Sequence, residues 1–284
     1  MTTPRDVMEL VRAPAALSVP GDAVAGAAAA SALGPRTAAL SAAAVCLYWA
    51  GMAANDWADR DLDADERPDR PIPSGRVTAG AALGVAAGLS AAGLALAALS
   101  GGRRALAVAV PLTGAVWAYD LKLKDTAAGP AAMATCRGLD VLLGASARRG
   151  GWRRALAPAL TVAAHTYTVT ALSRREVTGG SRLLPGATLV GTAGIALAAS
   201  GRAPRPGLAR SLAAWYAAGY GDAQVRALAT PDAGSVRAAV AAGITGLPAL
   251  QGALVARSAR PAAAAVVAAC APLGRALASR VSPT

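Results

Sequence analysis

The chain has 284 residues, of which 55% are hydrophobic and only 15% are charged. Soluble domains carry about 25% charged residues, so this composition argues against a soluble globular protein. The formal net charge is +12, and nearly all of the basic residues are arginines. These arginines occur singly or in pairs between apolar stretches, a pattern unlike the continuous basic stripe of a nucleic-acid-binding protein. We therefore expect no nucleic-acid partner.

Long uncharged stretches indicate the environment of the chain. Five of them contain no Asp, Glu, Lys or Arg: 37–55, 77–102, 155–173, 183–201 and 238–256. Each approaches or exceeds the roughly 20 apolar residues that cross a bilayer as a helix. The alternative, a soluble alanine-rich bundle, would need a polar face on every helix. The sequence therefore predicts an integral membrane protein with lipid around it.

Ten apolar segments follow one another along the chain: 8–32, 37–55, 77–100, 104–119, 128–146, 155–173, 183–200, 207–221, 234–256 and 261–278. The 207–221 segment is short and contains Arg210. It is therefore also compatible with a re-entrant or interfacial segment that does not span the membrane. No stretch alternates long enough for a barrel strand. We predict one membrane-embedded domain over 1–284, an all-α polytopic bundle of about nine transmembrane helices.

Three polar loops, 55–76, 119–127 and 174–182, follow the second, fourth and sixth predicted spans. Consecutive spans alternate in direction, so these three loops open on the same side of the bundle. The lysine and arginine counts of the two sides are nearly equal, so charge bias does not orient the chain. Polar groups that converge on one end of an apolar bundle are suited to a ligand with a charged head and an apolar tail.

The first of these loops contains Asn55, Asp56, Asp59 and Asp63 directly after an uncharged segment. If the helix continues, 100° per residue places all four within one arc. Carboxylate and amide oxygens are hard ligands, and Mg²⁺ is typically held by a few carboxylates together with phosphate oxygens. The cluster therefore predicts a Mg²⁺ site facing a diphosphate. The alternatives are a solvated acidic loop and a calcium site, although the glycine turn of an EF-hand loop is missing.

After the acidic cluster the chain reads Glu66-Arg67-Pro68-Asp69-Arg70-Pro71-Ile72-Pro73-Ser74-Gly75-Arg76. The three prolines end the helix and predict a rigid, extended return. Arg67 and Arg70 are candidate ligands for diphosphate oxygens, because the planar guanidinium binds phosphate through two N–H groups. For Arg76 an interfacial anchor is the favoured interpretation.

The 22 residues NDWADRDLDADERPDRPIPSGR resemble the first Asp-rich signature of the UbiA superfamily of membrane prenyltransferases, NDxxDxxxD followed by RPxRPIPSG. The resemblance implies a nine-helix bundle with the Asp-rich loops on the cytoplasmic side. It also implies that Asn55, Asp56, Asp59 and Asp63 bind Mg²⁺ and an isoprenyl diphosphate, with the three aspartates catalytic.

The segment Tyr119-Asp120-Leu121-Lys122-Leu123-Lys124 is similar to the YxxxLK element of the same family. This similarity implies catalytic roles for Tyr119 and Lys124 and diphosphate binding by both lysines. Farther on, Arg137 resembles a residue at the start of the fifth family helix and is a further candidate diphosphate ligand. Arg137 and Asp140 are charges within an apolar segment, where charges are costly and often functional. Their i, i+3 spacing equally permits a structural ion pair.

The second Asp-rich motif of the family, DxxxD, is missing from this chain. Residues 173–182 contain no aspartate, and Glu176 is their one carboxylate. Glu176 is therefore the remaining candidate metal ligand on that loop, or an arginine replaces the charge of a second metal.

His165 is the only histidine and is predicted to be a hydrogen-bonded core residue. Asp22 is a candidate to face an acceptor pocket.

These observations predict a Mg²⁺-dependent membrane enzyme that transfers an isoprenyl group from its diphosphate to an unidentified acceptor. Within the superfamily the alternative is a membrane terpene cyclase, in which the allylic cation is captured internally. Outside it, the alternative is a transporter or lipid-binding scaffold without chemistry, which would not need the Asp, Arg and Lys set.

Overall fold

The computed structural model describes residues 2–177, 179–201, 206–258 and 260–281, and in this part of the chain every regular element is helical. The elements in order are α1 (Pro4–Leu10), η1 (Ala13–Ser18), α2 (Val19–Ala29), α3 (Pro35–Ala58), α4 (Arg60–Glu66), α5 (Ala79–Gly101), α6 (Arg103–Ala118), η2 (Tyr119–Leu123), α7 (Gly129–Ala145), α8 (Gly151–Ser173), α9 (Leu183–Ala199), α10 (Pro206–Ala229), α11 (Ala233–Ala256) and α12 (Pro261–Val281). The all-α prediction is confirmed.

The predicted first segment, 8–32, is wrong as a single helix. It is divided into the end of α1, the 3₁₀ turn η1 and α2. The break follows from Arg12, whose backbone is left-handed at φ 47°, a conformation that no α-helix accepts. Pro14 then restarts the chain as the 3₁₀ turn, because proline favours the first turn of a helix. The other nine apolar segments each form one helix.

Among the residues that the structure describes, five helices are long and apolar enough to cross a membrane: Pro35–Ala58, Ala79–Gly101, Arg103–Leu123, Gly151–Ser173 and Ala233–Ala256. The 207–221 segment lies within α10, which is 24 residues long and so longer than expected. It buries one face through Ala209, Ala213, Tyr216 and Tyr220.

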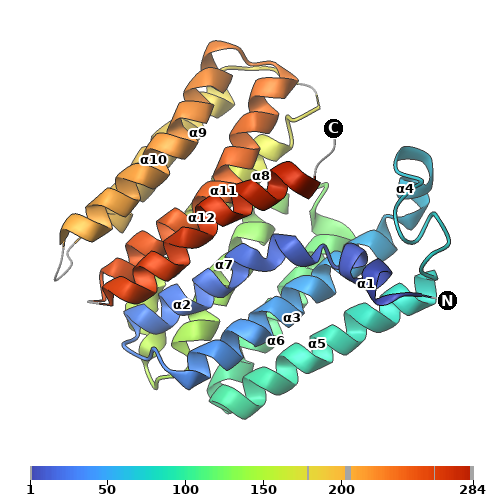
Figure 1. The fold of residues 1–284 in the computed structure, drawn as a ribbon, viewed down its shortest axis with the longest axis horizontal. Helices are drawn as coiled ribbons and strands as arrows, with labels where there is room; N and C mark the ends of the chain where they lie inside the picture. The colour runs from blue at the N-terminus through green and yellow to red at the C-terminus, as the bar shows by residue number, and fades with distance from the viewer. Residues whose placement is uncertain (1, 178, 202–205, 259, 282–284) are drawn as a thin grey trace.

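The long helices lie side by side and run from the lower left to the upper right of Figure 1. In one half α3 packs against α5, and α6 contacts α5 and α7; in the other, α10 packs between α9 and α11. Helices α2 and α7 join the halves, and their backbones nearly touch. A Cβ on Gly144 would lie 1.9 Å from the carbonyl oxygen of Ala23, and one on Gly26 would lie 1.7 Å from that of Val141.

The two ends of the bundle carry different connections. Helices α1 and α4 lie together with the N-terminus on the right of Figure 1. Loop residues 67–78 and η2 belong to the same end, which we call the Asp-rich end. The opposite end carries the turns between α2 and α3, α5 and α6, α7 and α8, and α11 and α12.

Candidate active site at the Asp-rich end

The four residues of the acidic cluster stay on one helical path, although α3 formally ends at Ala58. The amide of Asp59 donates to the carbonyl of Asn55, and the amide of Asp63 donates to that of Asp59. Asp56 and Asp63 are therefore on the same face and are buried, whereas Asp61 and Asp65 are exposed. The predicted common arc is confirmed for the buried pair, which shares one arginine.

That shared arginine is Arg70, which comes from the loop after α4. Its guanidinium lies 2.6 Å from Asp63 Oδ2 and 3.3 Å from Asp56 Oδ1. Arg67 lies 3.5 Å from the other Asp63 oxygen and is more exposed. Arg70 thus links two carboxylates that would otherwise repel each other in a partly dry site.

The loop that carries Arg70 is a series of turns, so the predicted extended return is wrong. Amides of Arg70, Ser74 and Gly75 donate to carbonyls three or four residues earlier, and Val77 N donates to Pro71 O. Prolines fix φ near the value that β-turns need at their second position, which favours turns over an extended strand here. The turns direct Arg70 back toward α3.

The second predicted loop reaches the same place. A π-helical turn, η2, follows α6, and Lys124 at its end forms an ion pair with Asp59. Asp120 is buried on η2 and lies within electrostatic reach of Asn55, Asp59 and Lys124. Gly51 makes room for it, because a Cβ there would lie 2.9 Å from Asp120 Oδ2. π-helical turns occur frequently at functional sites.

Arg12 is the cation that the sequence did not identify as a site residue. Its guanidinium lies 2.7 Å from Asp56 Oδ1, across 44 positions of the chain. The left-handed backbone of Arg12 turns the chain out of α1 and brings the side chain over α3. Such strained residues are common where a side chain must be aimed at a site.

An ion-pair cluster holds α1 in place beside this site. Arg76 donates to both carboxylate oxygens of Glu9, at 2.6 and 2.8 Å, and to Asp6 Oδ1 at 3.1 Å. The hydrogen bonds from Arg76 keep the pKa of Glu9 below its ordinary value of 4.5. Arg76 therefore ties the N-terminal helix to the Asp-rich loop, a more specific role than the predicted interfacial anchor.

Other predicted site residues lie apart from this cluster. Lys122 and Tyr119 belong to η2, where Lys122 is exposed and Tyr119 is half-buried. Glu176 is half-buried, and burial raises its pKa, with Arg237 of α11 opposing the shift. The loop of Glu176 is nevertheless at the Asp-rich end, because Arg174 donates to the carbonyl of Thr126. The predicted convergence of the three loops on one end is confirmed.

Arg137 lies inside the bundle, where it does not pair with Asp140. Its Nε lies 2.8 Å from Asp22 Oδ2 of α2, and Gln251 of α11 donates to the other Asp22 oxygen at 2.6 Å. Of the two interpretations left open for Arg137, an ion pair is found, but its partner is Asp22 and not Asp140 at i+3, because α2 packs on α7 closely enough for Asp22 to compete. His165 is buried and shares a 2.9 Å hydrogen bond with Tyr216, which confirms it as a hydrogen-bonded core residue.

The donor set at the Asp-rich end suits a hard cation. Asn55, Asp56, Asp59 and Asp63 offer only oxygens, and the buried Oδ1 of Asp63 has no hydrogen bond. Within the described ranges, no three acidic, histidine or cysteine side chains gather closely enough to hold an ion alone. Mg²⁺ often binds through one or two carboxylates plus substrate phosphate oxygens. The residues therefore fit an ion that binds together with a diphosphate.

Comparison with known proteins identifies the family. The model of the UbiA prenyltransferase family matches residues 19–182, which is more than half of the chain. The chain belongs to the UbiA prenyltransferase family. Asp56, Asp59, Asp63 and Lys124 all lie within the matched part, whereas Arg12 precedes it.

Relatives and solved structures agree with this assignment. Over 85 residues the chain is 42% identical to digeranylgeranylglyceryl phosphate synthase of Methanopyrus kandleri, covering 30% of each chain. Over 132 residues it is 37% identical to the synthase of the same name from Metallosphaera sedula, covering 45% of this chain and 44% of that one. The chain thus matches less than half the length of these relatives.

Two solved structures have the same fold. One is a UbiA homologue from Aeropyrum pernix, with a TM-score of 0.67 and 18% identity, covering 85% of this chain and 96% of that one. The other comes from work on digeranylgeranylglyceryl phosphate synthase in membranes, with a TM-score of 0.67 and 16% identity, covering 89% of this chain and 98% of that one. The UbiA-like bundle predicted from the motif is confirmed.

Proposed function

We propose that this chain transfers an isoprenyl group from an isoprenyl diphosphate to an acceptor within the membrane. The observation that supports the proposal most directly is the pairing at the Asp-rich end. Asp56, Asp59 and Asp63 each face a basic side chain that comes from another segment: Arg12, Lys124 and Arg70. A structural loop would not need three separate segments to deliver cations to one acidic helix face.

This arrangement explains how a diphosphate would be bound. Without a ligand, the carboxylates and cations neutralise each other. The diphosphate oxygens compete with the carboxylates for Arg12, Arg70 and Lys124, since charge-assisted hydrogen bonds to phosphate are strong. The freed oxygens of Asp56, Asp59 and Asp63, with Asn55, would hold Mg²⁺. When bound, the ion supplies charge neutralisation for the leaving diphosphate.

The chain's own residues would then favour bond cleavage and protect the product. Lys124 and Arg70 would stabilise the negative charge that develops on the diphosphate as its C–O bond breaks. The apolar helices below, α3 and α5 among them, would surround the isoprenyl tail and exclude water from the allylic cation. The Asp-rich end would face the cytoplasm, as the family resemblance implies.

For the acceptor, the names of the relatives support a glyceryl phosphate lipid, since both are digeranylgeranylglyceryl phosphate synthases. Attack by an acceptor hydroxyl forms the new C–O bond, releases diphosphate and yields one proton to solvent. Geranylgeranyl diphosphate and a geranylgeranylglyceryl phosphate acceptor are therefore the first pair to assay.

The test is pyrophosphate release from a panel of isoprenyl diphosphates with Mg²⁺ present. We expect Asp59→Asn and Asp63→Asn each to lower release about a hundredfold or more while the protein remains folded in detergent, because each removes a candidate metal ligand of the acidic cluster. EDTA should stop the wild-type reaction, and added Mg²⁺ should restore it. Asp61→Asn, an exposed neighbour, is the matched control. Near-normal release from both variants, or full turnover under chelation, would contradict the proposal.

A further inference from the structure

Among the described residues, the end of the bundle opposite the Asp-rich end carries arginines and no carboxylates. Its turns and the first residues of the helices that leave them contribute Arg36, Arg103, Arg104, Arg148, Arg149, Arg153, Arg154, Arg257 and Arg260. We call this set the arginine end. Segments 30–36, 101–104, 146–154 and 257–260 contain no Asp or Glu. The excess positive charge of the chain is thus gathered at one end.

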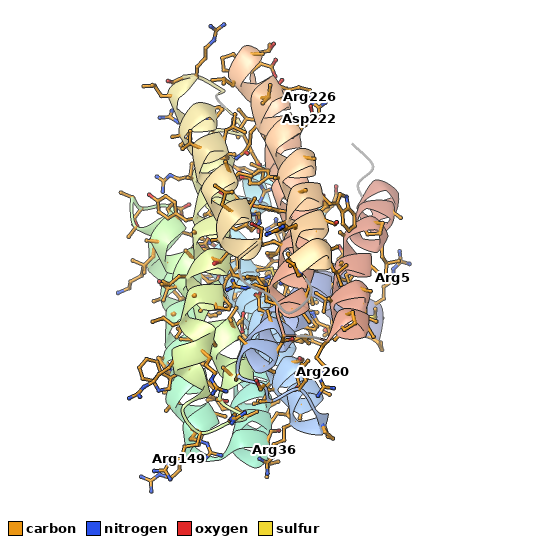
Figure 2. All side chains as sticks on the ribbon, turned by 90° about the vertical axis from the view of Figure 1, so that its left-hand side faces the viewer. Arg5, Arg36, Arg149, Asp222, Arg226 and Arg260 are labelled. Atoms are coloured by element: carbon orange, nitrogen blue, oxygen red, sulfur yellow. The ribbon has the colours of Figure 1, made fainter. Side chains whose placement is uncertain are left out.

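In Figure 2, Arg36 and Arg149 point outward from the lower edge of the bundle, and Arg260 lies above them on the right-hand side. In the part of the chain that the structure describes, none of the nine arginines forms an ion pair. The hydrogen bonds they do make use few of the five N–H donors of a guanidinium. Arg148 donates to Ala30 O at 3.4 Å and Arg257 donates to Ala198 O at 3.1 Å. Most of their donors are left for a ligand.

Helix dipoles add to this positive charge. Helices α3, α6, α8, α10 and α12 all begin at this end, and the N-terminus of a helix carries a partial positive charge. Helices α6 and α8 begin after Gly102 and Gly150, and neither has a side-chain cap. Their first amide groups therefore have no partner from a capping side chain.

Two notches are hollowed into the arginine end, and Ser31 lines both. One, of about 240 Å³, is lined by Arg154, Arg257, Ser258 and Ser31 above apolar side chains such as Leu254. The other, of about 490 Å³, is lined by Arg36, Arg148 and Ser31. Two arginines line each notch, together with two serines in the first and one in the second, a set suited to phosphate oxygens.

An exposed tryptophan, Trp152, lies at this end. Its side chain is 52% exposed, and the guanidinium of Arg153 lies 5.5 Å from the ring centre. Tryptophan is enriched where a membrane protein meets the headgroup region. We therefore expect the arginines beside it to lie at the level of lipid phosphates.

We propose that the arginine end is a binding site for the phosphate groups of anionic membrane lipids, seated in the two notches. Carboxylates are missing there, guanidinium donors are unused, and an interfacial tryptophan lies alongside. The apolar floor of the first notch, at Leu254, fits the start of an acyl chain. The proposal does not depend on the activity at the Asp-rich end.

The experiment uses the full chain in an uncharged detergent, with phosphatidylglycerol or phosphatidylcholine added and bound lipid counted by native mass spectrometry. We expect phosphatidylglycerol to bind more tightly than phosphatidylcholine. We also expect the affinity for phosphatidylglycerol to fall as ionic strength rises. The double variant Arg154→Gln/Arg257→Gln should lose roughly ten-fold or more in phosphatidylglycerol affinity, since a basic residue near the headgroups typically contributes several-fold. Arg154→Lys/Arg257→Lys should recover part of that loss.

The matched control is Arg5→Gln/Arg226→Gln, which removes the same charge from exposed positions away from the arginine end. It should change phosphatidylglycerol affinity less than two-fold. If Arg257 variants unfold, Arg36→Gln/Arg148→Gln tests the second notch with the same expected loss. The proposal would be overturned if phosphatidylcholine bound as tightly as phosphatidylglycerol, or if the control variant lost as much affinity as the Arg154→Gln/Arg257→Gln variant. Displacement of the lipid by millimolar inorganic phosphate would also overturn it, because the site would then bind free anions.

Discussion

Arg12 is a site residue that the sequence alone could not link to the acidic cluster. It occurs in an apolar N-terminal segment, 44 positions from Asp56, and no spacing rule links the two. The acidic cluster, by contrast, could be predicted, because Asn55, Asp56, Asp59 and Asp63 are neighbours on one helical path. Asp120 was also missed as a site residue, because its burial beside Asn55 depends on the π-helical turn and on Gly51.

Removing the Arg12 guanidinium should weaken substrate binding more than it slows the chemical step. We expect Arg12→Ala to raise KM for the isoprenyl diphosphate roughly ten-fold, the size of effect typical of a lost hydrogen bond to a charged group, with a smaller change in kcat. Steady-state pyrophosphate release measures both constants. Arg5→Ala, on the exposed side of α1, should leave KM unchanged. An unaltered KM in Arg12→Ala would show that the Asp56 contact is purely structural.

Glu176 provides the complementary test at the residue scale. It is half-buried and is influenced by Arg237 rather than by the motif aspartates. We therefore expect Glu176→Gln to lose only a few-fold in activity, far less than Asp59→Asn in the same assay. Complete loss in both variants would assign Glu176 a role equal to that of the first motif, and the absence of the second aspartate motif would then need another explanation.

At the scale of elements, apolar stretches predict where the helices lie but not how they are broken or how closely they pack. The 37–55 and 234–256 segments correspond to α3 and α11 because an uncharged run of that length is stable as a helix in lipid. The break at Arg12 depends on one residue's backbone, and the turns at 67–77 depend on tertiary anchors such as Arg76. Neither is encoded in hydrophobic periodicity.

The close approach of α2 and α7 gives an element-scale prediction. Gly144→Ala should lower the unfolding temperature in detergent, because the new Cβ would overlap the Ala23 backbone; overpacking of this kind typically costs about 1–3 kcal/mol. Gly88→Ala on α5 is the control, since its Cβ would meet nothing within 4 Å, and the better helix propensity of alanine should leave stability equal or slightly higher. Equal unfolding temperatures for wild type and Gly144→Ala would contradict the predicted overlap.

For the whole molecule, the fold separates two polar ends that share one bundle. The Asp-rich end pairs every motif carboxylate with a cation, and the arginine end has cations alone. The composition indicated a membrane protein, and the motif indicated its family. The net charge, as a sum over the whole chain, did not show that paired charges lie at one end and unpaired arginines at the other. Because α2 and α7 connect the two halves, the interior also holds the Arg137–Asp22 pair, whereas the sequence suggested Arg137 as a diphosphate ligand and Asp22 as a residue of an acceptor pocket.

Product analysis distinguishes prenyl transfer from cyclisation and from lipid binding without chemistry. Purified protein is incubated with farnesyl, geranylgeranyl or longer diphosphates and Mg²⁺, first alone and then with a glyceryl phosphate lipid acceptor, and extracts are analysed by mass spectrometry. We predict slow hydrolysis without acceptor and, once acceptor is added, a product heavier by one isoprenyl chain. Rapid formation of a cyclic hydrocarbon from the diphosphate alone, or no consumption of any diphosphate, would show that the chain is not a prenyltransferase of this kind.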